Sequence, residues 1–153
     1  MDFTNLFTNQ SEVVKMINKS FNNNRLAQLY LFYGEKGTLK MDAAIYFASL
    51  VLCEAGGNCG ICSQCKKIER LVNPNIYIVS PDGEVIKKEQ VEGLEHEFAM
   101  TSDYKRVFII KDIDKATLAA SNSLLKFLAT ILESTSFIPY SYSSLTLNNG
   151  LNL

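Results

Sequence analysis

The sequence lacks several features that define common functional classes. It has one histidine, His96, which is flanked by Glu95 and Glu97, so a hydrolytic triad has no candidates and a solvated side chain is expected. The longest apolar run, residues 43–53, is well short of the ~20 residues that span a bilayer. The first ten residues lack the basic start and apolar stretch of a secretory signal. These absences predict a cytoplasmic protein with no membrane partner.

The sequence also lacks an excess of positive or negative charge. The formal net charge is −1 and the isoelectric point is near 5.8, so the chain has none of the basic excess that nucleic-acid binders usually carry. Any role near DNA is therefore expected to be indirect.

What is present is enough for one folded domain. A chain of 153 residues can bury roughly 70% of the surface that its unfolded form exposes. Short apolar runs alternate with amphipathic stretches, which predicts an α/β fold. The run at 106–110 is nearly all apolar, as in a parallel strand that is buried on both faces. The predicted strands are residues 28–33, 75–79 and 106–110, and the predicted helices are residues 11–24, 39–52, 66–72, 88–101 and 115–132.

The strongest local pattern is a cluster of four cysteines. Their spacing is C-x5-C-x2-C-x2-C, and glycines between them supply tight turns. In a reducing compartment four thiolates favour a closed, structural zinc site, which leaves no open position for a substrate. An iron–sulfur cluster or unligated buried thiols are the alternatives. The predicted ligands are Cys53, Cys59, Cys62 and Cys65.

A glycine loop, GEKGTLKM at residues 34–41, lies between a predicted strand and a predicted helix. Gly34, Gly37 and Lys40 could wrap and contact phosphate, as in a P-loop. The hydroxyl that would bind Mg²⁺ after the lysine is replaced by Met41. An acid expected directly after the buried strand is replaced by Lys111, which would repel Mg²⁺. Hydrolysis of ATP is therefore not expected, and nucleotide binding is doubtful.

These features together resemble a known family. The glycine loop, the four cysteines, NPNIYIV, RVFII and above all AASNSLLKFL at residues 119–128 resemble delta-prime subunits of the bacterial DNA polymerase III clamp loader. The resemblance covers roughly residues 3–128. The paralogous gamma/tau subunits have a similar layout but keep the ATP-site residues that are replaced here.

The resemblance implies a fold, a role and partners. It implies an AAA+ type P-loop NTPase-like domain over residues 1–128, with a zinc module at 53–65, and an atypical tail at 129–153. It also implies a largely non-hydrolysing stator that assembles with gamma/tau and delta subunits and reaches the sliding clamp and DNA indirectly. The cysteines would be zinc ligands, and Gly34, Gly37 and Lys40 relics of the nucleotide loop.

Three departures from the family pattern are visible. The first cysteine spacer is shorter than in many relatives, and Asn73 stands where relatives often carry a histidine before proline. After Leu128 the family pattern stops, and the chain has no arginine beyond Arg106 to reach a neighbouring subunit's ATP. We hypothesise that the residues after Leu128 come from a shifted reading frame or an early stop in a longer gene, which sequencing the locus would test. A tail that has truly diverged from the family is the alternative.

The third departure has a structural consequence. The family strand order, 5-1-4-3-2, places the strand after the long helix in the middle of the sheet. Residues 137–147 contain Pro139, which suits an edge strand only. We therefore predict an incomplete sheet that lacks its middle strand and has unpaired edges.

A gamma/tau-like ATPase or a small zinc-containing nucleotide-binding enzyme is the alternative function.

Overall fold

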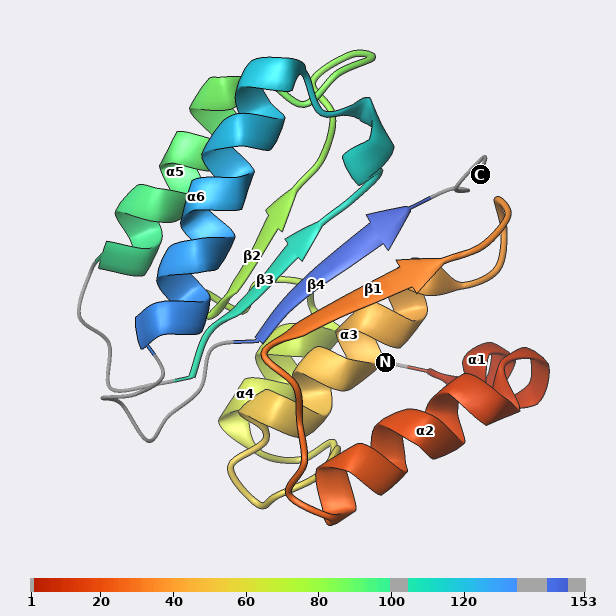
Figure 1. Ribbon diagram of the computed structural model, residues 1–153. Coiled ribbons are helices and arrows are strands. Elements are labelled where there is room, and N and C mark those ends of the chain that lie inside the picture. Colours follow the sequence, from red (N-terminus) through yellow and green to blue (C-terminus); the bar gives the residue numbers. More distant parts are fainter. Residues whose placement is uncertain (1, 100–104, 135–142, 149–153) are drawn as a thin grey trace.

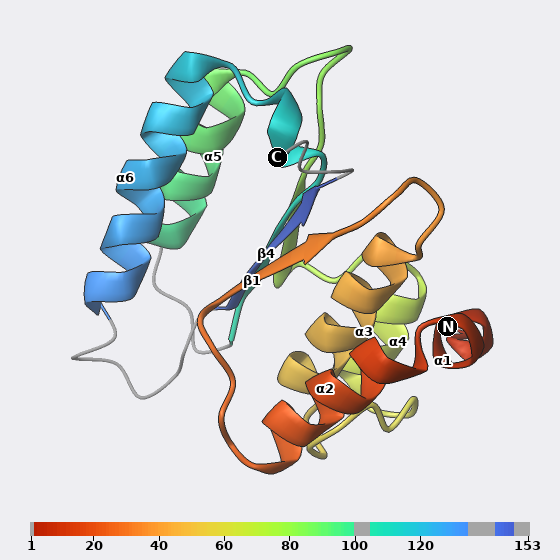
Figure 2. The same ribbon diagram turned by 45° about the vertical axis from the view of Figure 1, so that its right-hand side comes forward.

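The computed structural model describes residues 2–99, 105–134 and 143–148. Helices cover both faces of a parallel sheet, which gives three layers (Figures 1 and 2). The strands are β1 (Leu29–Tyr33), β2 (Ile76–Val79), β3 (Val107–Ile110) and β4 (Ser143–Asn148). The helices are α1 (Thr4–Asn9), α2 (Ser11–Asn22), α3 (Lys40–Leu52), α4 (Ser63–Glu69), α5 (Lys88–Ala99) and α6 (Leu118–Ser134), with a 3₁₀ turn at Ile113–Lys115.

The sheet has the order β1-β4-β3-β2, and all neighbouring strands are parallel. In the register, Leu29 lies opposite Ser144, and Val107 lies between Ser143 and Ile76. The carboxyl ends of the strands therefore meet at one edge of the sheet, next to the glycine loop that follows β1.

The prediction that the middle strand is missing is wrong, because β4 lies between β1 and β3. Pro139 itself is outside the described residues. It precedes β4, so each residue of β4 keeps the N–H donor that a central strand needs. The observed order is the expected one without the strand beside β1, so within the described residues the sheet is incomplete at that edge.

The core has two halves, one on each face of the sheet. Val107 and Ile109 of β3 pack with α1 to α4, whereas Phe108 and Ile110 pack with α5 and α6. All four β3 side chains are buried, which confirms the prediction of a strand covered on both faces. Helix α3 is buried along residues 43–52 and forms the centre of the first half.

The predicted helices and strands are found with shifted ends. Helix α4 begins three residues early, because the Cys62 sulfur accepts a hydrogen bond from the Cys65 N–H at its start. Helix α6 begins at Leu118 because residues 113–115 form the 3₁₀ turn, and it continues past Leu128 to Ser134. Helix α1 was not predicted. Residues 100 and 101 of the predicted fifth helix lie outside the described part.

The sequence pattern places Leu118, Leu124, Leu125 and Leu128 on the apolar side of α6, and this prediction is partly wrong. Leu118 and Leu125 are 80% and 66% exposed. The buried side instead centres on Phe127, whose ring lies 5.7 Å from that of Phe108 and 5.6 Å from that of Phe98. The aromatic cluster therefore determines which side of α6 faces the sheet.

In the part of the chain that the structure describes, no helix is long and apolar enough to cross a membrane.

Candidate metal centre and phosphate loop

The two candidate sites lie at opposite ends of α3. Lys40 of the glycine loop is the first residue of this helix, and Cys53 is its C-terminal cap. Because α3 is almost wholly buried, it holds both ends in place against the sheet.

The structure brings the four predicted cysteines together. Their sulfur atoms all lie within 4.8 Å of one another, and the Cys59–Cys65 and Cys53–Cys62 sulfur pairs are both 4.0 Å apart. None of them forms a disulfide. Cys53 and Cys65 are buried, and the other two are half-buried. The group could therefore hold a metal ion, and the shorter first spacer has not removed a ligand.

Backbone N–H groups point at the sulfurs. The amides of Cys62 and Cys65 donate to the sulfurs of Cys59 and Cys62, each over 3.4 Å. The Cys62 and Ile61 amides lower the pKa of the Cys59 thiol to about 6, whereas burial raises the pKa of Cys65 to about 12. Cys59 is thus ready to act as a thiolate ligand, while Cys65 would give up its proton to a bound cation.

The glycines between the cysteines take the conformation that tight turns require. Gly56, Gly57 and Gly60 have φ of 73°, 95° and 71°, which side-chain-bearing residues rarely adopt. This confirms the predicted turns that direct the sulfurs toward one point.

A buried amide network supports the cysteine module between α4 and the start of β2, and no sequence motif predicts it. The Asn73 side-chain amide donates to the Gln64 backbone carbonyl and, over 2.8 Å, to Gln64 Oε1. Its own oxygen accepts a 2.8 Å bond from the Asn75 N–H. Asn73 and Gln64 are both buried. Asn73, the residue that departs from the family pattern, therefore joins α4 to the start of β2.

In the glycine loop, Lys40 is engaged by the loop itself. Its ammonium donates to the carbonyls of Gly34 and Glu35, over 2.8 and 2.6 Å, and to the Thr38 hydroxyl over 3.2 Å. The Thr38 hydroxyl in turn donates to the Glu35 carbonyl. All three donor positions of the ammonium are therefore used within residues 34–40.

A cavity of about 230 Å³ lies beside this loop, at the carboxyl edge of the sheet. Met41 and Lys111 both line it, and neither side chain offers an oxygen that could bind Mg²⁺. The cavity is also smaller than the roughly 300–1,000 Å³ of typical ligand pockets. The remaining lining residues are Gly37, Thr38, Leu39, Lys40, Asp42 and Asp112.

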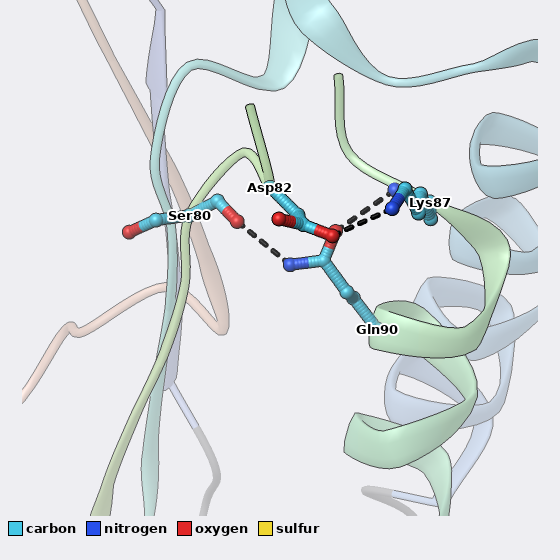
Figure 3. A network of polar contacts seen from close by, with 4 residues as sticks. All are labelled: Ser80, Asp82, Lys87 and Gln90. Carbon is cyan, nitrogen blue, oxygen red and sulfur yellow. Dashed lines mark hydrogen bonds and ion pairs between the residues drawn. The ribbon is translucent and has the colours of Figure 1, made fainter. Parts of the chain in front are cut away.

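A polar network orders the loop between β2 and α5 (Figure 3). Gln90 Oε1 accepts from the Lys87 N–H at the start of α5, and Gln90 Nε2 donates to the Ser80 carbonyl. The Lys87 ammonium pairs with Asp82 over 2.6 Å. Backbone bonds from Ile86 to residues 115 and 117 then join this loop to the segment after Lys111. The network therefore supports the segment that carries the far wall of the cavity.

The weaker candidates behave as surface residues. His96 is exposed on α5. Lys87 and Lys88 are exposed and form ion pairs with Asp82 and Glu92.

Comparison with known proteins agrees with these observations. Residues 9–138 match the family described as DNA polymerase III, delta subunit. The chain is 43% identical over 123 residues to DNA polymerase III subunit delta' of Bacillus subtilis, covering 78% of this chain and 37% of that protein. It is 28% identical to subunit delta' of Pseudomonas aeruginosa, covering 67% and 33% of the two chains. It is 27% identical to subunit tau of Bacillus subtilis, covering 78% and 22%.

Among solved structures, a DNA polymerase III gamma subunit-related protein from Thermotoga maritima superposes with a TM-score of 0.50 at 16% identity, covering 92% of this chain and 38% of that one. This likeness concerns the fold, and it agrees with the predicted α/β class, a parallel sheet with helices on both faces. The chain spans only about a third of the length of the delta' relatives. It belongs to the DNA polymerase III delta subunit family, and it is similar to the N-terminal part of delta'.

Proposed function

We infer that the chain acts as a delta-prime-like clamp-loader subunit that hydrolyses no ATP and serves as a stator. It would assemble with gamma/tau and delta subunits and reach the sliding clamp and DNA through them. The single observation that carries this proposal is the closed glycine loop, in which Lys40 donates to three oxygens of its own loop.

A hydrolysing site needs a free lysine and a bound magnesium ion. In P-loop enzymes the lysine contacts the outer phosphates, and a hydroxyl and a later acid hold Mg²⁺. Here Lys40 would first have to break its own hydrogen bonds, and Met41 and Lys111 supply neither metal ligand.

The metal that best fits the cysteine module is zinc in a structural role. A tetrahedral site with Zn–S bonds of ~2.3 Å has sulfur–sulfur edges of about 3.8 Å. The two closest sulfur pairs, at 4.0 Å, are near this value. All four ligands would come from the protein, so zinc would hold α3 and α4 together and take no part in a reaction.

The similarity to tau favours one alternative, a gamma/tau-like ATPase or a zinc-containing nucleotide-binding enzyme. In that case Lys40 would turn from its loop carbonyls to a phosphate. Two observations disfavour this alternative: Lys40 is hydrogen-bonded to its own loop, and the positive charge of Lys111 lines the cavity where magnesium would bind.

Titration with ATP, with and without Mg²⁺, separates the two functions. The proposal expects no magnesium-dependent tightening and no phosphate release by the purified chain. Magnesium-dependent binding with turnover would contradict it and favour the ATPase. Co-purification with gamma/tau and delta subunits tests the assembly role, and failure to assemble under conditions where full-length delta' does so would count against it.

We also propose that residues 1–128 form the nucleotide-binding-type domain, and that residues 129–153 are an atypical tail whose β4 adds to the sheet of this domain. Limited proteolysis followed by mass spectrometry tests that boundary. A stable product that ends well before or after residue 128 would contradict it.

A further inference from the structure

The four-cysteine module combines sulfurs on a fixed part of the chain with sulfurs on an exposed part. Cys53 caps the C-terminal end of α3 and Cys65 lies within α4, and both are buried. Cys59 and Cys62 are half-buried. The Cys59–Cys65 and Cys53–Cys62 sulfur pairs are both 4.0 Å apart. Each of these pairs therefore joins one half-buried sulfur to one buried sulfur.

A cavity of about 270 Å³ reaches the module from the side of Cys65. Asn58 also lines this cavity, and its side-chain oxygen lies 3.9 Å from the Cys65 sulfur. Ser49 and Glu69 add polar groups to the lining. A cavity holds one water molecule once it offers roughly 10–15 Å³, so this one has ample room for a molecule as small as hydrogen peroxide. A small oxidant can thus reach a buried sulfur of the module.

The chain around Cys59 has room to move. A disulfide would bring the sulfurs of a pair from 4.0 Å to ~2.05 Å. Residues 54–61 belong to neither half of the core. Within the described part of the chain, a Cβ added at Gly56, Gly57 or Gly60 would meet no heavy atom closer than 4 Å. The Cys59 sulfur can therefore approach Cys65 while the two helices stay in place.

We propose that the four-cysteine module is a peroxide-sensitive switch, in which oxidation joins Cys59 to Cys65 and Cys53 to Cys62 and releases the bound metal ion. This inference rests on the zinc role proposed above. It adds that the same four sulfurs hold α3 and α4 together in two alternative ways, by a shared ion or by two disulfides.

The reaction balances with one hydrogen peroxide molecule for each disulfide. The Cys65 sulfur, which faces the cavity, attacks a peroxide oxygen, so an S–O bond forms and the O–O bond breaks. The Cys59 sulfur then attacks the Cys65 sulfur, so the S–S bond forms and the S–O bond breaks. Each hydroxide that leaves takes a proton from solvent and becomes water. The two sulfurs have then given two electrons to the peroxide.

A second peroxide pairs Cys62 with Cys53 by the same two steps. A metal ligand must be a thiolate, and a sulfur in a disulfide is no longer one. The ion therefore loses its ligands as the disulfides form. Reduction of both bonds by a dithiol returns the four thiols and allows the ion to bind again.

Zinc release under peroxide tests the switch. The reduced, zinc-loaded chain is treated with hydrogen peroxide in steps, and a colorimetric chelator measures the freed ion. About two peroxide molecules should release one ion, and titration should find all four thiols consumed. Tandem mass spectrometry after blocking of free thiols should identify the Cys59–Cys65 and Cys53–Cys62 bonds. Dithiothreitol with added zinc should restore the original metal content.

Asn58→Leu tests the cavity as the route of the oxidant without changing a ligand. The leucine side chain would fill space beside the Cys65 sulfur. The rate of zinc release should therefore fall several-fold, while the zinc content of the reduced variant should equal that of the parent chain. Asn122→Leu, at an exposed position on α6, is the matched control and should release zinc at the parent rate.

The outcomes separate this inference from the zinc role on which it rests. A reduced chain that binds no metal would contradict the zinc role and the switch together. A zinc-loaded chain that keeps its ion under peroxide, or loses it through sulfinic acids without disulfides, would overturn the switch alone. Release with a Cys59–Cys62 bond would refute the pairing, and an unchanged rate in Asn58→Leu would refute the cavity as the route.

Discussion

The two ends of α3 carry sites in opposite condition. At its C-terminal end, four sulfurs converge on one point and the ligand set is complete. At its N-terminal end, the glycine loop keeps the turn of a phosphate site, but its lysine is bound to the loop and Met41 follows it. The difference shows that a phosphate-type loop can keep its backbone turn after it has lost the side chains that bind magnesium. In the loop, Lys40 itself satisfies the carbonyls and so preserves the turn.

The comparison also separates two kinds of dependence. Under the proposed function the cysteine module depends on an external ion, because a bound cation would hold its four sulfurs together. The glycine loop depends on internal hydrogen bonds and needs no ligand to hold its form. Substitutions in the two sites should therefore differ in what they change.

The largest effect is expected from Cys65→Ser. This change removes a buried sulfur while nearly keeping the side-chain volume. Zinc content should fall from about one ion per chain to near zero, and unfolding should become easier by several kcal/mol, because metal binding contributes directly to folding. Elemental analysis and urea unfolding measure the two quantities. Ser63→Ala, at an exposed position in the same helix, is the control. Unchanged zinc and stability in Cys65→Ser would show that the sulfurs hold no structural ion.

The next largest effect tests whether the buried Asn73–Gln64 amide network stabilises the cysteine module. Asn73→Ala removes three hydrogen bonds that join α4 to the start of β2 and leaves the buried Gln64 side-chain oxygen only the 3.4 Å bond from the Asn75 amide. The free energy of unfolding should fall by about 1–3 kcal/mol, the usual cost of an unsatisfied buried polar group. Asn122→Ala, on the exposed side of α6, should change it by less than about 0.5 kcal/mol. Equal effects in the two variants would mean that the amide network adds nothing to the module.

Much of this arrangement could be predicted from the residues. The spacing of the cysteines indicated one shared site, because short spacers limit where the sulfurs can go. The apolar run of β3 indicated burial on both faces, and Phe108 and Ile109 now lie in opposite halves of the core. Met41 and Lys111 were each judged unfit for magnesium, and the structure places both at one cavity.

What could not be predicted depends on contacts between distant residues. The buried side of α6 follows from Phe127 meeting Phe98 and Phe108, which periodicity within the helix cannot show. The position of β4 depends on two partner strands that lie far away in the sequence. The hydrogen-bond partners of Lys40 and Asn73 could not be predicted from a sequence motif, because lysine and asparagine form hydrogen bonds with many kinds of partner.

A smaller effect is expected in the glycine loop. Lys40→Met keeps the apolar stem but removes three hydrogen bonds, so it should destabilise the chain by about 1 kcal/mol. In a working P-loop the same change would weaken ATP binding, whereas here the ATP titration should not change. Lys36→Met, at an exposed position in the same loop, should affect neither property. A loss of ATP affinity confined to Lys40→Met would show that the loop is still a nucleotide site, and the two ends of α3 would then no longer differ in this way.

The smallest effect concerns the loop between β2 and α5, where Asp82 and Lys87 form an exposed ion pair. The hydrogen bond to Lys87 holds the pKa of Asp82 below its usual ~3.9, and the same bond raises the pKa of Lys87 above its usual ~10.4. The contribution of Asp82 to stability is therefore present above its unfolded-state pKa and is lost as the pH falls through the lowered folded-state pKa. The contribution of Lys87 is fully present below its unfolded-state pKa and is lost as the pH rises through the raised folded-state pKa.

The pair should thus add a constant, small amount to stability across the neutral range. The melting temperature of Asp82→Asn should lie slightly below that of the parent chain between these limits, and the difference should vanish at strongly acidic and strongly alkaline pH. Glu84→Gln, at an exposed acid in the same loop, controls for the loss of one negative charge. A difference that grows toward acidic pH would reverse the sign expected for a lowered carboxyl pKa. In that case the order of the loop between β2 and α5 would depend on the hydrogen bonds of Gln90 and not on the ion pair.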